Sequence, residues 1–262
     1  TFTGYSLSPT VSSQLTGAGV LTFAEAADYE ASSSYTGTVT FTDGFNSVTS
    51  DITINLNNLN DNSPVFTSSG SLSVNENQRA IVTVAASDAD GDTVSYTLSG
   101  TDADALTINS SSGVLTFNSA PDYETKSSYS AVVTASDGTN ASAQTLSISI
   151  INVNEFTPTF TSDATFTVNE NETAIGTVTA SDGDGDSLTF SISGSDININ
   201  ASSGVISFAS APDYETTTSY SATVTVSDGT VSATQAITVN ITNLDDNAPS
   251  IPGYGTTTSN EF

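Results

Sequence analysis

The string Asn58-Leu59-Asn60-Asp61-Asn62 is the first of three Asn-rich strings that recur along the chain. The second, Asn152-Val153-Asn154-Glu155-Phe156, begins 94 residues later. The third, Asn243-Leu244-Asp245-Asp246-Asn247, begins a further 91 residues on. A motif that returns at a nearly constant spacing is typical of tandem structural repeats.

Four other motifs keep the same phase. Asp-Tyr-Glu begins at Asp28, Asp122 and Asp213, and Asp-Gly begins at Asp43, Asp137 and Asp228, so both step by 94 and then 91 residues. Two more occur twice, 94 residues apart: Asn75-Glu76-Asn77 with Asn169-Glu170-Asn171, and Asp88-Ala89-Asp90-Gly91-Asp92 with Asp182-Gly183-Asp184-Gly185-Asp186. Five motifs in one phase make chance a poor explanation.

The segments between these motifs have the pattern of β-strands. Apolar and polar residues alternate with period two in 94–98, 129–135, 145–151 and 234–241. β-Branched and aromatic residues are enriched there, and Gly, Asn, Asp and Pro separate the segments. Short strands at this spacing predict an all-β fold built from β-sandwiches, although a barrel would also satisfy the pattern.

The composition is strongly acidic but not that of a disordered tail. The 262 residues include 29 acidic and two basic residues and no His, which gives a net charge of −27, yet only 12% of residues are charged. Because two basic residues cannot neutralise a phosphate backbone, nucleic acid is excluded as a partner, and an anionic membrane surface is disfavoured. No stretch is long and apolar enough for direct membrane insertion.

The acidic residues fall where strands are expected to end. Calcium takes six to eight oxygen ligands from carboxylates, Asn side chains and backbone carbonyls, and a string such as Asn60-Asp61-Asn62 offers all three. A single Asp or Asn of this kind is more often a turn former. Glu is a poor turn residue but a good bidentate ligand, so the repeated Asp-Tyr-Glu and Asn-Glu-Asn favour calcium. An EF-hand does not fit, since Thr93 and Ser99 stand at its Gly and Glu positions.

The combination of motifs resembles the cadherin repeat family. The matching pieces are the Glu of Asn-Glu-Asn, the Asp-x-Asp pair, Asp-Tyr-Glu, the Asp of Ser-Asp-Gly, and the inter-repeat linker that ends before Pro and Phe (residues 60–66). The Asp-Gly-Asp variant and the Lys-poor, Ser/Thr-rich composition are similar to bacterial cadherin-like repeats of large surface adhesins. The resemblance implies seven-strand Greek-key β-sandwiches in an elongated rod, with Ca²⁺ bound between successive repeats, at an extracellular or cell-surface location.

The repeat phase divides the chain into four parts. We expect a partial repeat at 1–62 that lacks its first strands, complete repeats at 63–156 and 157–247, and a tail or the start of a further repeat at 248–262. The partial repeat is aligned by matching Tyr5-Ser6-Leu7 with Tyr96-Thr97-Leu98.

The resemblance also implies the metal ligands. The first junction would use Asp28, Glu30, Asn58, Asn60, Asp61, Asp88, Asp90 and Asp137. The second would use Glu76, Asp122, Glu124, Asn152, Asn154, Glu155, Asp182, Asp184 and Asp228. A half site facing a further repeat would use Glu170, Asp213, Glu215, Asn243, Asp245 and Asp246, and Asp43 would belong to an upstream junction. Asn152 and Glu155 stand where the family usually has Asp, so one ion of the second junction is expected to be lost or weakened.

Three classes of function compete. The repeats could be a spacer that holds an adhesive tip away from a surface, or they could themselves bind a neighbouring repeat, a cell-surface protein or a carbohydrate. A filament subunit joined by strand donation, with 251–262 as donor, is a variant of the second class. An enzyme is disfavoured because the chain has no His and no Trp, and because repetition argues against a unique active site.

Overall fold

The fold is nearly all-β. The computed structural model describes residues 2–8, 13–15, 21–23, 25–42 and 45–246, so Asp43, Asn247 and the proposed donor segment lie outside the described residues. The chain forms two compact units, Thr1–Asn152 and Val153–Phe262, and each is described by itself. Within the described ranges, no helix has the length and apolar character needed to cross a membrane.

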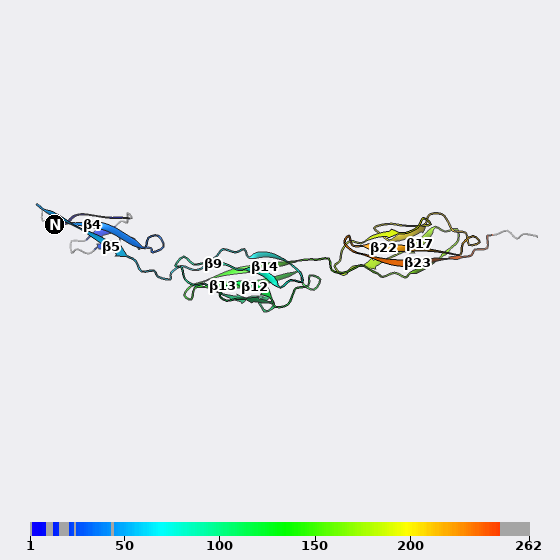
Figure 1. The fold of residues 1–262 in the computed structure, drawn as a ribbon, viewed down its shortest axis with the longest axis horizontal. Helices are drawn as coiled ribbons and strands as arrows, with labels where there is room; N and C mark the ends of the chain where they lie inside the picture. Colours follow the sequence, from blue (N-terminus) through cyan, green and yellow to red (C-terminus); the bar gives the residue numbers. More distant parts are fainter. Residues whose placement is uncertain (1, 9–12, 16–20, 24, 43–44, 247–262) are drawn as a thin grey trace, which may run out of the picture. The chain divides into compact units, whose positions relative to one another are not determined.

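The first unit contains a complete two-layer sandwich (Figure 1). Its larger sheet has the order β10 (Ser95–Ser99), β13 (Ser128–Ser136), β14 (Ala141–Ile151) and β7 (Ser71–Asn75). Its smaller sheet has the order β11 (Leu106–Ile108), β12 (Val114–Phe117) and β8 (Ala80–Thr83), with a separate ladder of β6 (Val65–Phe66) and β9 (Ala86–Ser87). The 3-10 turn η1 (Ala103–Ala105) precedes β11. Strand β7 pairs in parallel with β14, whereas the other neighbours are antiparallel.

The core lies between these two sheets. Leu146 and Ile148 of β14 are fully buried, and Ser147 and Ser149 between them are exposed, as alternation along a strand requires. They face Leu115 and Phe117 of β12, which are also fully buried. This burial accounts for the period-two pattern of the sequence.

The second unit repeats the same topology. Its larger sheet has the order β16 (Thr165–Asn169), β23 (Ser232–Thr242), β22 (Ser219–Ser227) and β19 (Thr189–Ile192), again with a parallel β16–β23 pair. Its smaller sheet has the order β17 (Ala174–Thr177), β21 (Val205–Phe208) and β20 (Ile197–Ile199), beside a ladder of β15 (Thr159–Phe160) and β18 (Ala180–Ser181). The sequence repeat is therefore a structural repeat.

Residues 1–62 contribute a smaller set of strands to the first unit. The sheet of β1 (Phe2–Ser8), β4 (Ser34–Thr42) and β5 (Ser47–Asn55) corresponds to β10, β13 and β14. The ladder of β2 (Ser13–Leu15) and β3 (Leu21–Phe23) corresponds to β11 and β12. In the described sheet, β5 is an edge strand.

The predicted alignment of Tyr5 with Tyr96 is wrong by two residues. Tyr5 pairs with Val39, whose counterpart one repeat later is Val133, and Val133 pairs with Leu98. Tyr5 therefore corresponds to Leu98. Strand β1 takes its register from the hydrogen-bonded ladder with β4, which is interrupted between Phe2 and Gly4, and not from the match of one Tyr with another.

Candidate metal centre

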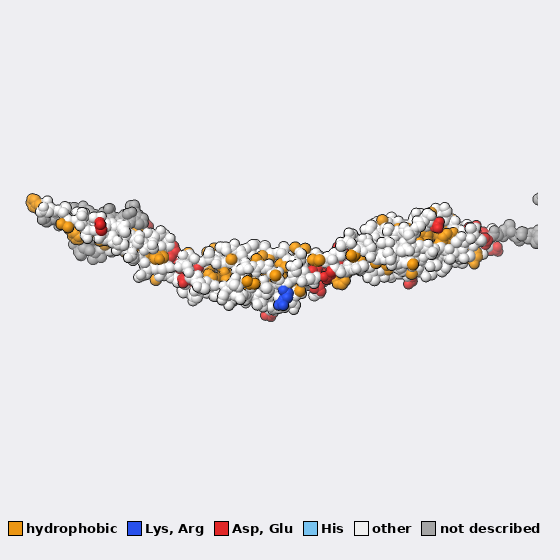
Figure 2. Space-filling model, viewed as in Figure 1, with side chains coloured by type: hydrophobic (Ala, Val, Ile, Leu, Met, Phe, Trp, Pro, Cys, Tyr) orange, Lys and Arg blue, Asp and Glu red, His pale blue; other side chains and the backbone are white. Residues whose placement is uncertain are grey.

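Acidic side chains gather in small groups on the face shown in Figure 2. In the first unit, the linker between β5 and β6 is tied to the Asp triplet that follows β9. The Oδ2 atom of Asp90 accepts hydrogen bonds from the backbone N–H groups of Asp61 (3.1 Å) and Asn62 (2.8 Å). The Asn58 amide donates to the Asp90 carbonyl oxygen at 2.7 Å. The linker and the triplet, which both carry expected ligands of the first junction, therefore lie together.

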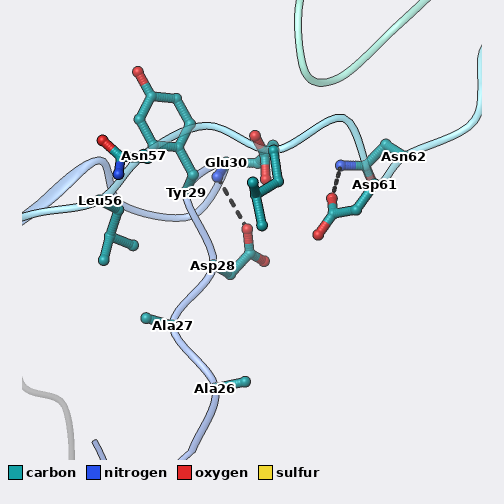
Figure 3. A pocket seen from close by; sticks show the side chains of 10 residues that line it. Ala26, Ala27, Asp28, Tyr29, Glu30, Leu56, Asn57, Asp61 and Asn62 are labelled. Carbon is teal, nitrogen blue, oxygen red and sulfur yellow. Dashed lines mark hydrogen bonds between the residues drawn. The ribbon is translucent and has the colours of Figure 1, made fainter. Parts of the chain in front are cut away.

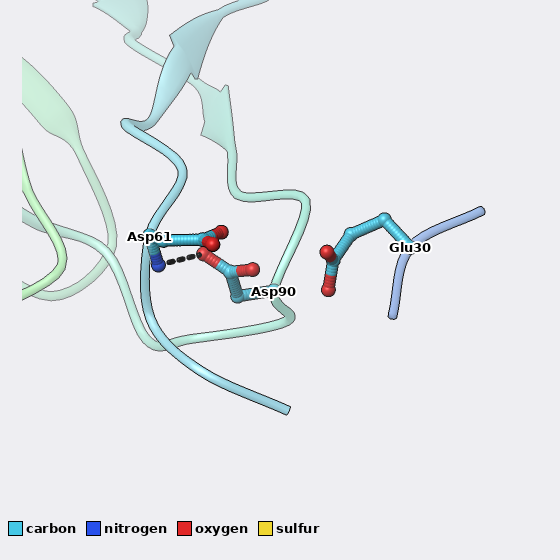
Figure 4. A group of neighbouring side chains, drawn as sticks. All are labelled: Glu30, Asp61 and Asp90. Carbon is cyan, nitrogen blue, oxygen red and sulfur yellow. Dashed lines mark hydrogen bonds between the residues drawn. The ribbon is translucent and has the colours of Figure 1, made fainter. Parts of the chain in front are cut away.

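Glu30 completes a group of three carboxylates with Asp61 and Asp90. One oxygen from each lies within 4.8 Å of the others, and Figure 4 shows Glu30 opposite the other two. The side-chain amide of Asn62 donates to Asp90 Oδ1 (2.9 Å) and to Asp61 Oδ1 (3.1 Å), so it bridges two of the three. This residue was not among the predicted ligands.

Neighbouring groups shift the pKa values of two of these carboxyl groups, Asp90 and Glu30. The Asn62 amide is the main cause that lowers the pKa of Asp90. Partial desolvation, with the neighbouring Asp28 and Asp90 carboxylates, raises the pKa of Glu30. The ionised form is thus favoured for Asp90 and disfavoured for Glu30. A divalent cation bound beside both carboxyl groups would favour the ionised form of Glu30 as well.

The Asp triplet forms a second group that shares Asp90. One oxygen each of Asp88, Asp90 and Asp92 lies within 4.8 Å of the others. Asp88 Oδ1 accepts the backbone N–H groups of Asp90 (3.0 Å) and Asp92 (3.4 Å), and Gly91 between them has a φ of 82°, which favours glycine. Asp92 is a candidate ligand that the sequence argument missed.

Asp137, in the turn between β13 and β14, approaches the same linker. Its Oδ1 atom accepts the backbone N–H groups of Thr139 (2.7 Å) and Asn140 (2.6 Å). Partial burial raises the pKa of Asp137, but these N–H groups and a contact from Asn60 outweigh it, so the pKa is lowered overall. The Asn140 amide donates to Asn60 Oδ1 at 3.0 Å. Asp28, by contrast, caps its own turn by accepting the N–H of Glu30 at 2.9 Å.

The second unit has a closely similar loop. Asp184 Oδ2 accepts the backbone N–H groups of Glu155 (3.0 Å) and Phe156 (2.8 Å), and Asp182 Oδ1 accepts that of Asp184 (3.0 Å). Asn154 donates to Asp186 Oδ2 at 2.9 Å, which makes Asp186 a second residue that the prediction missed. Asn152 directly follows β14 in the first unit and is half-buried.

Each complete sandwich also has an acidic group at its other end. Glu76, which is 1% exposed, lies with Asp122 and Glu124 so that one oxygen of each is within 4.8 Å of the others. Glu170, also 1% exposed, groups in the same way with Asp213 and Glu215. Hydrogen bonds of neighbouring Thr side chains lower the pKa of both Asp122 and Asp213.

The remaining predicted residues lie near the last of these groups. Asn243 donates to Glu215 Oε1 at 3.2 Å, and Asp246 Oδ2 accepts the Asn171 amide at 2.8 Å. Asp245 is exposed.

Some buried carboxylate oxygens have no hydrogen-bond partner, and these orphaned oxygens indicate whether the loops could bind a cation. Asp88 Oδ2 and Asp137 Oδ2 are buried and have no hydrogen-bond partner, and so are the corresponding oxygens of Asp182 and Asp228. A buried anionic oxygen without a partner is costly unless a cation coordinates it. The same two atoms recur in both repeats, and oxygen ligands are the chemistry that calcium requires, so the residues fit this metal.

The basic residues of the chain do not neutralise these groups. Lys126 pairs with Asp102 at 2.5 Å, and Arg79 Nε donates to the Phe117 carbonyl oxygen at 3.0 Å. These are the two basic residues of the whole sequence. The compensating charge must therefore come from ions in solution.

Comparison with known proteins identifies the fold. A family model described as "Cadherin domain" matches residues 70–154, which contain strands β7 to β14 of the first complete sandwich. Human protocadherin Fat 4 is 36% identical over 155 residues, which cover 54% of this chain and 3% of that protein. Residues 70–154 therefore resemble a cadherin domain, and the chain is similar to cadherin repeats. It spans a very small part of the length of the curated relatives that it matches.

Solved structures support tandem cadherin repeats as the architecture. Mouse cadherin-23 EC22-24 has a TM-score of 0.62 at 22% identity, covering 92% of this chain and 86% of its own. Protocadherin Gamma B2 extracellular cadherin domains 3-6 has a TM-score of 0.75 at 19% identity, covering 91% of this chain and 68% of its own. Residues 154–242 also match a family model described as "Bacterial Ig domain", although this repeat has the same sheet order as the preceding cadherin repeat.

Proposed function

We propose that this chain is a calcium-binding extracellular adhesion or spacer module that calcium stiffens. The proposal includes the repeat boundaries drawn from the sequence, with a partial repeat at 1–62, repeats at 63–156 and 157–247, and a tail or further repeat from 248. It also includes an elongated arrangement at an extracellular or cell-surface location. Cadherin homology supports an extracellular adhesion module.

The orphaned oxygens of Asp88, Asp137, Asp182 and Asp228 carry the proposal. At the first site, Ca²⁺ would be bound by the two carboxylate groups that share Asp90, with Glu30 from the partial repeat and Asp61 from the linker. The proposed ligands there are Asp28, Glu30, Asn58, Asn60, Asp61, Asp88, Asp90 and Asp137. We add Asp92 to the proposal because it groups with Asp88 and Asp90. On the strength of the sequence repeat, the proposal extends to the second and third sets of predicted ligands.

Mechanically, the residues of the first site act as a charge-dependent joint. Two carboxylates about 4 Å apart repel by about 1 kcal/mol even in water, so Glu30 and Asp90 tend to separate when no cation is bound. A bound Ca²⁺ supplies the positive charge that reverses this interaction. Glu30 belongs to the partial repeat and Asp90 to the repeat that follows it. A cation that draws these two carboxylates together would therefore hold the two repeats together.

We assign no catalytic role to these groups. An aspartate of ordinary pKa is already charged near neutral pH, and the lowered pKa of Asp90 and of Asp137 strengthens this preference, which suits cation binding and not proton donation. The chain also lacks His and Cys.

Isothermal titration calorimetry of the calcium-free chain tests the proposal. We expect calcium to bind with a dissociation constant on the order of 10⁻⁴ M, as in extracellular modules, because ligands from separate repeats must be brought together. Magnesium should bind more weakly, since it demands near-ideal octahedral geometry. No heat of calcium binding up to millimolar concentration would reject the assignment.

A further inference from the structure

The two linker loops share one hydrogen-bonded frame but differ in two side chains. In each loop, the central Asp of the triplet accepts two backbone N–H groups of the linker. Asn62 and Ala89 of the first loop correspond, 94 residues later, to Phe156 and Gly183 of the second. An amide beside a methyl group in one loop is thus exchanged for an aromatic ring beside a glycine in the other.

In the first loop, amide side chains hold the linker and the carboxylates together. The amide of Asn62 donates to Asp61 Oδ1 at 3.1 Å (Figure 3) and to Asp90 Oδ1 at 2.9 Å. The amide of Asn140 donates to the Asn62 carbonyl oxygen at 3.0 Å. The counterpart of Asn140 is Val231, which is 39% exposed and has no side-chain donor. The second loop therefore lacks both amides.

In the second loop, the ring of Phe156 contacts the backbone at Gly183. A Cβ atom at Gly183 would lie 2.8 Å from both Cδ atoms of the ring, well inside the distance at which carbon atoms attract. Gly183 does not have the positive φ that favours glycine, whereas Gly185 has a φ of 76°. The ring, and not the backbone conformation, therefore requires the glycine at position 183.

The carboxylate beside this contact is shielded from water. Asp184, which follows Gly183, is 7% exposed, whereas its counterpart Asp90 is half-buried. Phe156 itself is 47% exposed, so its ring covers the loop from the outside and does not belong to the core of the sandwich. Charges interact more strongly where water is excluded.

We propose that Phe156 is a positioning residue for the cation of the second loop. Its ring, which lies on Gly183, keeps water away from Asp184 and so strengthens the attraction of this carboxylate for a divalent cation. The side chain of Phe156 offers no oxygen ligand, so it acts only through the loop that it covers. The inference rests on the proposed function, because it concerns one of the proposed calcium sites.

A calcium titration of the whole chain, followed by amide NMR, tests this inference. The amide of Gly185 reports the second loop, and that of its counterpart Gly91 reports the first. Phe156→Ala should weaken the calcium binding seen at Gly185 about tenfold and leave that seen at Gly91 unchanged. Phe156→Leu keeps an apolar side chain and should recover most of the affinity. Val205→Ala removes a side chain of similar exposure, 48%, from β21 and should change neither titration.

Gly183→Ala tests whether the ring acts through its contact with the loop. The added Cβ would displace the ring, so this variant should weaken binding at Gly185 as much as Phe156→Ala does. The double variant should bind no more weakly than either single variant, because an alanine without the ring has the space that Ala89 has. With europium(III) in place of calcium, luminescence decay in H₂O and D₂O should count more bound water molecules in both single variants than in the wild type.

Three results would overturn the inference and leave the proposed function intact. A titration at Gly185 that is the same in the wild type and in Phe156→Ala rejects a role for the ring. Additive losses in the double variant reject the contact with Gly183 as its means. An unchanged count of bound water rejects shielding as the cause. If calcium shifts neither Gly91 nor Gly185 in the wild type, the proposed function fails, and this inference fails with it.

Discussion

Replacing Asp90 with alanine should remove calcium binding at the first site, with affinity there reduced about tenfold or more, because ligand charge sets the affinity of calcium sites. Asp90 belongs both to the group with Glu30 and Asp61 and to the group with Asp88 and Asp92. One substitution therefore removes a carboxylate from two groups. Calorimetry should show fewer calcium ions bound per chain, while the remaining sites keep their affinity.

Two further variants separate charge from hydrogen bonding at this position. Asp90→Asn keeps an oxygen that can accept the backbone N–H of Asn62 but loses the charge, so its calcium binding should be close to that of Asp90→Ala. Asp104→Asn removes a carboxylate from an exposed position in the same repeat and should leave the isotherm unchanged. An Asp90→Ala isotherm identical to that of the wild type would show that these groups do not bind the metal.

Replacing Glu170 with alanine should destabilise the second unit by about 2–4 kcal/mol, because two backbone N–H groups lose a charged acceptor at a buried position. Those donors belong to Tyr214 and Leu244, and Glu170 is 1% exposed. Scanning calorimetry in excess chelator, which removes any effect of bound calcium, should show one thermal transition at lower temperature. The first unit should unfold as in the wild type.

Two glutamine variants serve as controls for the loss of stability expected in Glu170→Ala. Glu170→Gln retains one accepting oxygen and should cause a smaller loss than Glu170→Ala. Glu172→Gln, at an exposed position two residues along, should cause none. If Glu170→Ala unfolds at the wild-type temperature without calcium, the buried glutamate serves as a ligand only and does not close the sandwich.

The period-two pattern and the motif phase predicted the fold well, because both report the burial that repeats with each sandwich. Leu146 and Ile148 are buried where alternation required. The resemblance to cadherin repeats, and not the motif phase, implied that the linker of Asp61 would meet the triplet of Asp90, and the two lie together in the structure. Sequence similarity misplaced β1, whose register depends on pairing with β4 and on an irregularity near Gly4.

Other features of the candidate site depend on side-chain orientation, which spacing does not encode. The amide of Asn62 bridges two carboxylates, although in the sequence it is one more Asn in a linker. Asp92 joins its group because Gly91 turns the backbone back toward Asp88. The third Asp of each triplet, Asp92 or Asp186, repeats in the sequence with the other two. This repetition could have placed it among the predicted metal ligands.

The central claim is that calcium fixes the partial repeat to the repeat that follows it. Spin labels at Val48→Cys and Ser149→Cys report this directly, since both positions are exposed on strands β5 and β14 and the chain has no native Cys. Their distance distribution, measured by pulsed electron paramagnetic resonance, should be narrow in millimolar calcium and broad in excess chelator. Distributions of equal width in calcium and in chelator would contradict the account.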